Sequence, residues 1–349
     1  MPTVSVIIPS YNHEKFVAEA IQSVLSQTYQ DFEIIITDDA SSDQSVNAIK
    51  QFADPRIRFF CFTENQGGSA TTNHCIKQAR GKYIALLNSD DVFLPDKLSK
   101  QVAYLETHHH CAAVFSHAQV IHENGEPFTD DNNFYVQVFT QKNRTRYEWL
   151  NLFFYHGNCL CHPSMLIRKE CFDRYGLYDS RLAQLDDFDM WIRLCLNHEI
   201  HILQEKLIKF RVLRGNKNAS ALRPDTMLRI PWEHRMVLNH FLKITTLPEL
   251  NLIFPEIKIK EDIDSRLIPF YLAHAALSVK QPMHNHFAIQ TFFNMLGDYP
   301  QELKQYFNFT YKSLTQLTGN ISLIGEYRDR GRASRILFAA RDAIKRCFA

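Results

Sequence analysis

Two pairs of aspartates directly follow apolar segments that are typical of strands. Asp90-Asp91 follow residues 83–87, and Asp38-Asp39 follow residues 32–37. Mg²⁺ and Mn²⁺ take oxygen ligands, usually one or two protein carboxylates completed by substrate phosphates, so Asp90-Asp91 are candidates for a metal and diphosphate site. A carboxylate after the second segment could accept the imide N–H of a pyrimidine, with Tyr11 stacked on the ring. Each pair alone is also typical of a turn or a helix start.

A third acidic cluster opens a segment with helical spacing. Asp186, Asp187 and Asp189 precede an apolar face that includes Phe188 and Trp191. Three carboxylates in four positions exceed what a helix dipole needs. Because an apolar aromatic wall raises the pKa of a nearby carboxylate toward the range of a general base, this cluster is a candidate source of a catalytic base.

Alternating strands and helices must position these acids. Strands are expected at residues 4–8, 32–37, 57–62, 83–87 and 112–116, and helices at residues 14–27, 45–52, 70–79 and 95–107. This alternation predicts an α/β fold with a mostly parallel sheet covered on both faces. Ligands of such sheets bind outside the carboxyl ends of the strands. The polar clusters after those ends should therefore line one edge: Pro9-Ser10-Tyr11-Asn12, Asp38-Asp39, Thr63-Glu64-Asn65 and Asn88-Ser89-Asp90-Asp91.

The rest of the chain has a different pattern. Residues 122–146 are polar with little periodicity, which at this length is typical of a functional loop. After residue 224 only helical spacing recurs, within residues 226–243, 262–279, 284–297 and 300–317. A helical region is therefore expected to follow the α/β domain.

Composition narrows the class of function. The 39 basic residues nearly balance the 38 acidic ones, so no global field favours nucleic acid. No stretch approaches 18 uninterrupted apolar residues, and the opening apolar run is too short for a signal peptide, so a cytoplasmic protein is expected. The eight cysteines have no repeated spacing and are expected to be free thiols.

The three acidic motifs together resemble the family 2 glycosyltransferases over residues 3–220. The resemblance is carried by VSVIIPSYNHEKFVAEAIQSVLSQTYQDFEIIITDDASSD, by ENQGGSATTNHCIKQARGKYIALLNSDDVFLPDKL and by CHPSMLIRKECFDRYGLYDSRLAQLDDFDMWIRL. It implies a GT-A-type, Rossmann-like catalytic domain over residues 1–224, followed by a helical C-terminal region over residues 225–349. It also implies an inverting transferase that uses a nucleotide-diphosphate sugar, expected to be a UDP-sugar, and Mn²⁺ or Mg²⁺.

The resemblance assigns roles to the residues of the donor side. The implied nucleotide-sugar-binding residues are Pro9, Ser10, Tyr11 and Asp39 at the nucleoside and Asp90 at the ribose, with Asn65 and Asn88 on the same edge, and Asp91 is the implied metal ligand. The chain departs from the family at three positions: Asn88 replaces an acid, Thr72 replaces an arginine and Leu213 replaces a histidine. Arg211 or Arg214 then becomes a candidate to neutralise the diphosphate.

The resemblance also assigns an acceptor side. Asp187 matches the catalytic base, which would take the proton of an acceptor hydroxyl as it attacks the anomeric carbon opposite the leaving diphosphate. His162 and Asp186 are expected near the acceptor. The expected acceptor is a glycan or a lipid-linked glycan, the transferred unit a hexosyl or N-acetylhexosaminyl group, and the process cell-surface polysaccharide synthesis.

Three further signals have ordinary explanations. The run His108-His109-His110 favours a solvated helix end, because neighbouring side chains point in different directions. Cys159 and Cys161 lack a second pair at zinc spacing and are expected to pack as thiols. The basic, amphipathic residues 328–349 fit either a peripheral helix at the inner face of a membrane or a helix packed on its own domain.

Two other functions are alternatives to glycosyl transfer. A sugar nucleotidyltransferase usually needs a Gly-rich basic loop after the first strand, and PSYNHEKF contains no glycine. A non-catalytic nucleotide-sugar-binding or scaffold protein would be favoured by loss of the metal or base carboxylate, whereas Asp91 and Asp187 are both present.

Overall fold

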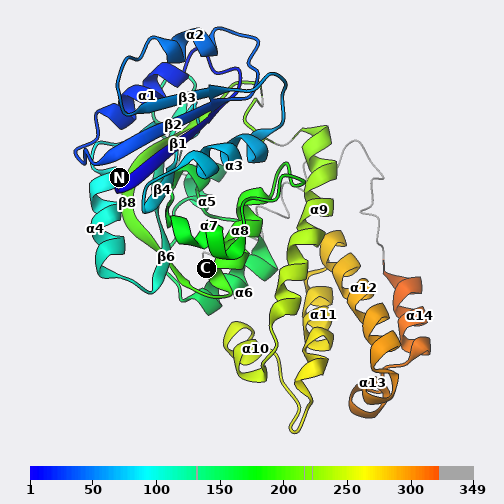
Figure 1. The fold of residues 1–349 in the computed structure, drawn as a ribbon. Coiled ribbons are helices and arrows are strands. Elements are labelled where there is room, and N and C mark those ends of the chain that lie inside the picture. The colour runs from blue at the N-terminus through cyan, green and yellow to red at the C-terminus, as the bar shows by residue number, and fades with distance from the viewer. Residues whose placement is uncertain (131–132, 216, 222, 322–349) are drawn as a thin grey trace. The chain divides into compact units, whose positions relative to one another are not determined.

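The computed structural model describes residues 1–130, 133–215, 217–221 and 223–321 (Figure 1). The chain forms two compact units. The first consists of Met1–Arg146 and Cys159–Leu222, and the second of Tyr147–Asn158 with the chain from Arg223 onward. The second unit thus includes a short segment from within the first part of the sequence. The assignment of residues 1–224 as a catalytic domain and 225–349 as a helical region remains a prediction.

The first unit is built on a mixed sheet, which within the described residues has eight strands in the order β3-β2-β1-β4-β7-β6-β8-β5. The strands are β1 (Val4–Ser10), β2 (Phe32–Asp38), β3 (Ile57–Cys61), β4 (Tyr83–Leu86), β5 (Val92–Phe93), β6 (Cys111–His122), β7 (Leu166–Arg168) and β8 (Glu199–Val212). Strands β3, β2, β1 and β4 are parallel to one another. Strand β7 is antiparallel to β4 and β6, β8 is parallel to β6, and β5 is antiparallel to β8.

The parallel strands are apolar because both of their faces are covered. Every residue of β2 is buried, and β1 is buried except for the partly exposed Pro9. Strand β1 lies between β2 and β4, so the chain moves to one side of β1 for β2 and β3 and returns to its other side for β4. The carboxyl ends of β1 and β4 therefore form the switch point at which such sheets bind ligands.

Helices flank this sheet (Figure 1). They are α1 (Val17–Leu25), α2 (Ser45–Lys50), α3 (Gly68–Gln78), α4 (Lys97–Thr107), α5 (Phe134–Val138), α7 (Lys169–Tyr175) and α8 (Asp186–Cys195). The buried residues of α1, Val17, Ala20, Ile21 and Val24, follow the helical spacing expected from the sequence. After α3 the chain passes close to β1 at Gly81, where a Cβ atom would lie 2.6 Å from the Ser5 backbone nitrogen.

The largest difference from the sequence-based expectation is β8, a strand of 14 residues for which none was expected. Strand β6 is also longer than expected, because it continues to His122. Part of the polar stretch 122–146 forms the short helix α5. The seven cysteines within the described residues are free thiols, and Cys159 and Cys161 are buried.

The second unit is helical within its described residues. Its helices are α6 (Arg146–His156), α9 (Pro224–Leu238), α10 (Leu247–Ile253), α11 (Ile268–Val279), α12 (Pro282–Asp298), α13 (Pro300–Phe307) and α14 (Tyr311–Asn320). Phe154 of α6 is fully buried among the rings of Phe241, Phe254 and Phe287. His284 of α12 hydrogen bonds through Nε2 to the Phe154 carbonyl at 2.7 Å. These contacts explain why α6 belongs to the second unit.

Within the described residues, every helix is too short or too polar to cross a bilayer. The expected amphipathic segment at residues 328–349 lies outside the described residues.

Acid should destabilise the second unit through two buried histidines. Burial lowers the pKa of His234 to about 3 and that of His284 to about 4, whereas an unperturbed histidine titrates at 6.5. Below that pH the unfolded chain binds protons that the folded chain does not, so the free energy of unfolding falls as the pH drops toward 4. The loss is at most about 1.4 kcal/mol per pH unit for each group.

Urea unfolding at about pH 7 and about pH 5 measures this effect. His284→Gln keeps an N–H donor for the Phe154 carbonyl but does not titrate. The variant should therefore lose less stability on acidification than the native chain. Equal losses in the two proteins would contradict the prediction.

Candidate active site

The two carboxylates at the end of β2, Asp38 and Asp39, bind different partners. Asp38 accepts hydrogen bonds from the Ser41 backbone N–H at 2.8 Å and from the Ser10 hydroxyl at 3.2 Å, which ties the ends of β1 and β2 together. Asp39 accepts from the backbone N–H groups of Gln66 and Gly67 at 2.7 and 2.9 Å. Asp39 is thus fixed at the start of α3 and is buried.

Other predicted nucleoside-side residues surround Asp39. Asn65 donates from its side-chain amide to the Asp39 carbonyl at 3.3 Å. Ser10 is buried, Pro9 is partly exposed, and the Tyr11 side chain is exposed. Tyr11 is therefore accessible to a ligand, as base stacking requires. The structure brings these five residues to one edge of the sheet, while their roles remain predictions.

A tight turn after β4 holds the second acidic pair. The Asp91 N–H donates to the Asn88 carbonyl at 3.0 Å, and the Asn88 side-chain amide donates to Asp91 Oδ2 at 3.0 Å. The other oxygen, Asp91 Oδ1, accepts from the Arg211 backbone N–H at 2.8 Å. Asn88, which stands where the family has an acid, thus orients Asp91 through a hydrogen bond.

His13 is a neighbour of this pair that the sequence did not reveal. Its Nε2 lies 4.0 Å from Asp90 Oδ2, and its Nδ1 hydrogen bonds to the Ser89 hydroxyl at 2.8 Å. His13 follows Tyr11-Asn12 in the polar cluster after β1, so its place in that cluster was the only available signal. It links the end of β1 to the end of β4.

The electrostatics of the acidic pair favour a cation. Burial raises the pKa of Asp90, and the charges of His13 and Arg211 oppose that shift. Burial raises the pKa of Asp91 well above its usual value, and the charge of Asp90 raises it further. Two buried carboxylates that repel each other are stabilised by a divalent cation.

The donor set also fits such an ion. Within the described residues, no group of three His, Cys, Asp or Glu side chains could hold a metal, and this includes the neighbourhood of His108–His110. The described side chains alone therefore do not form a complete coordination shell for a metal ion. A Mg²⁺ or Mn²⁺ site usually takes one or two carboxylates, with phosphate and water completing it, and Asp91 with Asp90 meets that requirement.

Arg211 supports the turn from β8. Its side chain is 2% exposed and donates to the Asp90 carbonyl at 2.7 Å, the Glu123 carbonyl at 2.9 Å and Glu19 at 2.6 Å. These contacts occupy all three guanidinium nitrogens. The predicted contact of Arg211 with a donor diphosphate is not tested by this geometry, but the side chain clearly holds protein groups together.

The position expected for the family's histidine is occupied by a buried leucine. Leu213 is buried, and its backbone N–H donates to Asn218 Oδ1 at 2.7 Å. The Asn218 amide donates in turn to the Arg211 carbonyl at 2.8 Å. The segment after β8 is therefore fixed by an asparagine side chain.

The acids of the third cluster have separate environments. Asp189 is buried and forms an ion pair with Arg193 at 2.7 Å, so it stabilises α8. Asp186 accepts from the Ser69 hydroxyl of α3 at 2.6 Å. Asp187 accepts from the Phe188 N–H at 2.6 Å and is partly exposed. Asp186 and Asp187 are the two partly exposed acids of this cluster, and their acceptor-side roles remain predictions.

His162 forms part of a hydrogen-bonded chain near these acids. Its Nε2 bonds to the Tyr178 hydroxyl at 2.9 Å, and Asn73 of α3 exchanges two hydrogen bonds with the Tyr178 backbone. Burial lowers the pKa of His162 to about 3, so its imidazole is neutral at physiological pH. Burial and the charges of Asp186 and Asp187 raise the pKa of Tyr178. Sequence patterns gave no signal for Tyr178.

Cys161 relates the donor and acceptor sides. Its thiol is buried, and its pKa is raised by burial, by the charge of Asp91 and, more weakly, by that of Asp187. The predicted metal ligand and the predicted base therefore both lie within electrostatic range of one residue. Both acids belong to the first unit, although 96 positions of sequence separate them.

Comparisons with known proteins agree with this architecture. Residues 5–176 match the family described as Glycosyl transferase family 2. An uncharacterized glycosyltransferase of Methanocaldococcus jannaschii is 30% identical over 244 residues, which cover 67% of this chain and 81% of the relative. The putative teichuronic acid biosynthesis glycosyltransferase TuaG of Bacillus subtilis is 36% identical over 128 residues, which cover 36% of this chain and 50% of TuaG.

A solved structure shows the same fold. S. aureus TarS in complex with UDP-GlcNAc aligns with a TM-score of 0.58 at 18% identity, covering 88% of this chain and 93% of that chain. The predicted α/β fold of GT-A type is confirmed. The chain belongs to glycosyl transferase family 2, and the resemblance found in the sequence is thereby confirmed.

Replacing Arg211 by methionine should destabilise the fold by several kcal/mol. The change removes the donors of two backbone carbonyls, and each buried polar group left without a partner costs about 1–3 kcal/mol. Glu19→Gln is the matched control, because the Glu19 side chain is 52% exposed and the loss should be at most about 1 kcal/mol. Urea unfolding measures both.

The Arg211→Met variant also distinguishes a role of Arg211 in folding from a role in binding the donor. Native-like stability of Arg211→Met combined with lost nucleotide-sugar binding would show that the side chain serves the donor instead of the fold.

Proposed function

We propose that this family 2 glycosyltransferase is an inverting enzyme that moves a hexosyl or N-acetylhexosaminyl group from a UDP-sugar to a hydroxyl of a glycan or lipid-linked acceptor. The observation that carries the proposal is that both acidic sites are bound to α3: Asp39 accepts from the N–H groups just before the helix, and Asp186, the neighbour of Asp187, accepts from Ser69 in its first turn. The name of TuaG refers to teichuronic acid biosynthesis, and TarS has been solved with UDP-GlcNAc. The name of TuaG supports a role in cell-surface polysaccharide synthesis, and the TarS complex supports a UDP-sugar donor.

The donor would bind along the carboxyl ends of β1, β2 and β4. Two backbone N–H groups hold Asp39, which would contact the base of the nucleotide. The exposed ring of Tyr11 would stack on that base. Asp90 would contact the ribose, and Asp91 would hold Mn²⁺ or Mg²⁺ together with the diphosphate. A bound divalent ion supplies Lewis-acid stabilisation of the charge that develops on the leaving diphosphate.

The chemical step needs a base on the acceptor side. Asp187 would accept the proton of the acceptor hydroxyl while that oxygen forms a bond to the anomeric carbon. The bond from this carbon to the diphosphate oxygen breaks at the same time, and its electron pair leaves with the nucleoside diphosphate. Attack from the face opposite the leaving group inverts the configuration. His162, neutral and held by Tyr178, would hydrogen bond to the acceptor.

The setting in the cell follows from the same proposal. A nucleotide-sugar donor is consistent with the expected cytoplasmic location, and a lipid-linked acceptor with the expected peripheral contact at the inner face of the membrane. Both remain predictions.

Asp187→Asn should reduce kcat for transfer by about 10²–10⁴-fold, because it removes the general base. Donor affinity should change little, since the donor contacts lie at Asp39, Asp90 and Asp91. Asp173→Asn is the matched control, because it makes the same chemical change on a side chain that is 70% exposed. Transfer rates and donor affinities with UDP-sugars measure the split, and full turnover by Asp187→Asn would refute the assignment of the base.

Asp91→Asn should remove the response of the protein to metal. The substitution takes away the charged oxygen ligand that a divalent ion prefers. A ligand that binds only the native state raises the melting temperature with its concentration. Thermal melts with UDP and Mn²⁺ should therefore show a shift in the native chain and almost none in the variant. An unchanged shift would exclude Asp91 as the metal ligand.

A further inference from the structure

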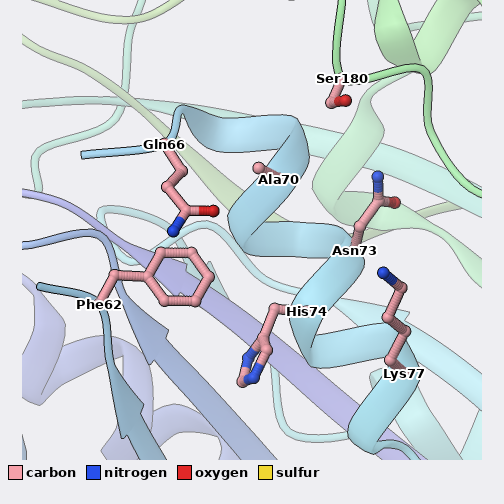
Figure 2. Close-up of a pocket in the computed structure, with 7 residues that line it drawn as sticks. All are labelled: Phe62, Gln66, Ala70, Asn73, His74, Lys77 and Ser180. Atoms are coloured by element: carbon pink, nitrogen blue, oxygen red, sulfur yellow. The ribbon is translucent and has the colours of Figure 1, made fainter. Parts of the chain in front are cut away.

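A groove on α3 lies beside the proposed active site and has no role in the mechanism above. It encloses about 260 Å³ and is lined by Phe62, Gln66, Ala70, Asn73, His74, Lys77 and Ser180. Figure 2 shows α3 between Phe62 on one side and Ser180 on the other. This volume lies below the range of about 300–1,000 Å³ for drug-sized ligands, which suits one sugar ring better than a nucleotide sugar.

The groove follows one face of the helix. Ala70, Asn73 and Lys77 are separated by three and four residues, a spacing that places them on one face of α3, and Gln66 lies just before the helix begins. The backbone N–H of Gln66, at one end of the groove, binds Asp39. The groove therefore begins beside the proposed nucleoside site and continues along about two turns of α3, from Ala70 to Lys77.

The opposite wall belongs to the segment that carries the acceptor-side residues. Asn73 exchanges two hydrogen bonds with the Tyr178 backbone, and Tyr178 holds His162. The hydroxyl of Ser69 also bonds to the Leu182 carbonyl at 3.0 Å. Ser180 lies between these two fixed points, so the groove adjoins the part of the protein where the acceptor would bind.

The lining chemistry suits a sugar that carries negative charge. Lys77 is exposed, forms no ion pair within the described residues, and its ammonium end points along the groove toward Asn73 (Figure 2). No carboxylate lines the groove. The Phe62 ring supplies an apolar surface that the face of a sugar ring can cover. Gln66 and Ser180 supply amide and hydroxyl groups for sugar hydroxyls.

His74 adds a neutral hydrogen-bonding group. Its Nδ1 bonds to the Thr37 hydroxyl at 2.9 Å, and its ring contacts Phe62 edge-on at 5.2 Å between centroids. Burial and the nearby charge of Lys77 lower the pKa of His74, so the imidazole is neutral at physiological pH. Lys77 is thus the charged group that selects the ligand.

We propose that this groove is a subsite for the acceptor glycan and that it binds a uronate residue of that glycan, with the sugar face on Phe62 and the carboxylate at Lys77. The inference rests on the proposed function, because it takes the acceptor to be a glycan. The subsite binds a residue next to the one that reacts and sets which acceptors are held.

Binding can be tested without turnover, with probes that differ only in charge. Cellobiouronic acid and cellobiose share two sugar rings, and only the first carries a carboxylate. Saturation-transfer NMR with the full chain should show tighter binding of the acid, and the preference should weaken with salt. Inorganic phosphate should compete poorly, because it has no ring to cover Phe62. Equal binding of the two sugars, or phosphate binding as tight as that of the acid, would overturn the proposal.

Variants locate the site. Lys77→Gln should weaken binding of cellobiouronic acid about two- to fivefold, as expected for one exposed charge contact, and leave cellobiose unaffected. Lys142→Gln is the matched control, because Lys142 is an exposed lysine of the same unit outside the groove. Phe62→Ala should weaken both sugars. No effect of Lys77→Gln, or an equal effect of Lys142→Gln, would refute the site.

A donor measurement separates this inference from the proposed function. Melting shifts with UDP and Mn²⁺ should be the same in Lys77→Gln and the native chain. Sugar binding at Lys77 without any donor response would leave the subsite standing and refute the proposed donor. A melting shift with UDP and Mn²⁺ but no preference for the uronate would refute the subsite and leave the proposed donor standing.

Discussion

The arrangement of the first unit depends on holding two adjacent carboxylates, Asp90 and Asp91, inside the protein. Burial and mutual repulsion make this costly, as the raised pKa of Asp91 shows. The fold compensates at Asp91 with two hydrogen-bond donors, the Asn88 amide and the Arg211 N–H, and it places His13 4.0 Å from Asp90. The repulsion that remains between the two carboxylates is unfavourable in the ligand-free protein, and a bound divalent cation would neutralise it.

Strand β8 supplies the most distant of these donors. Its antiparallel register with β5 pairs Val92 with Lys209, so the preceding Asp91 comes opposite the residues just before the end of β8. That register brings the Arg211 N–H to Asp91 Oδ1 across 120 positions of sequence. The Arg211 guanidinium then joins α1 through Glu19 and the loop after β6 through Glu123. The strand pairing that completes the sheet therefore also places Arg211 against the Asp90-Asp91 pair.

This dependence on β8 explains what the sequence could and could not predict. Strands β1 and β2 were expected within two residues of their observed bounds, because their apolar runs end at turn residues. Strand β8 was missed because the exposed Gln204, Glu205 and Lys206 interrupt its alternation. Strands β7 and β5, with three and two residues, are too short for any periodic signal.

The same limit applies to the candidate site. Asp39, Asp90, Asp91 and Asp187 could be selected because acids after strand ends and at a helix start form recognisable local patterns. The residues that hydrogen bond near these acids could not be predicted from the sequence, because a bond such as that between Asn73 and Tyr178 joins residues 105 positions apart. Such contacts follow from how the chain folds back on itself, and no local period encodes them.

Helix α3 shows how the fold sets the distance between the two halves of the site. Asp39 binds the N–H groups just before the helix, Ser69 in its first turn binds Asp186, and Asn73 one turn later binds Tyr178. Because hydrogen bonds within a helix fix its rise per residue, the separation between nucleoside side and acceptor side is set by α3. Thr72, which stands where the family resemblance implies an arginine, is buried between these anchors and adds no charge to them.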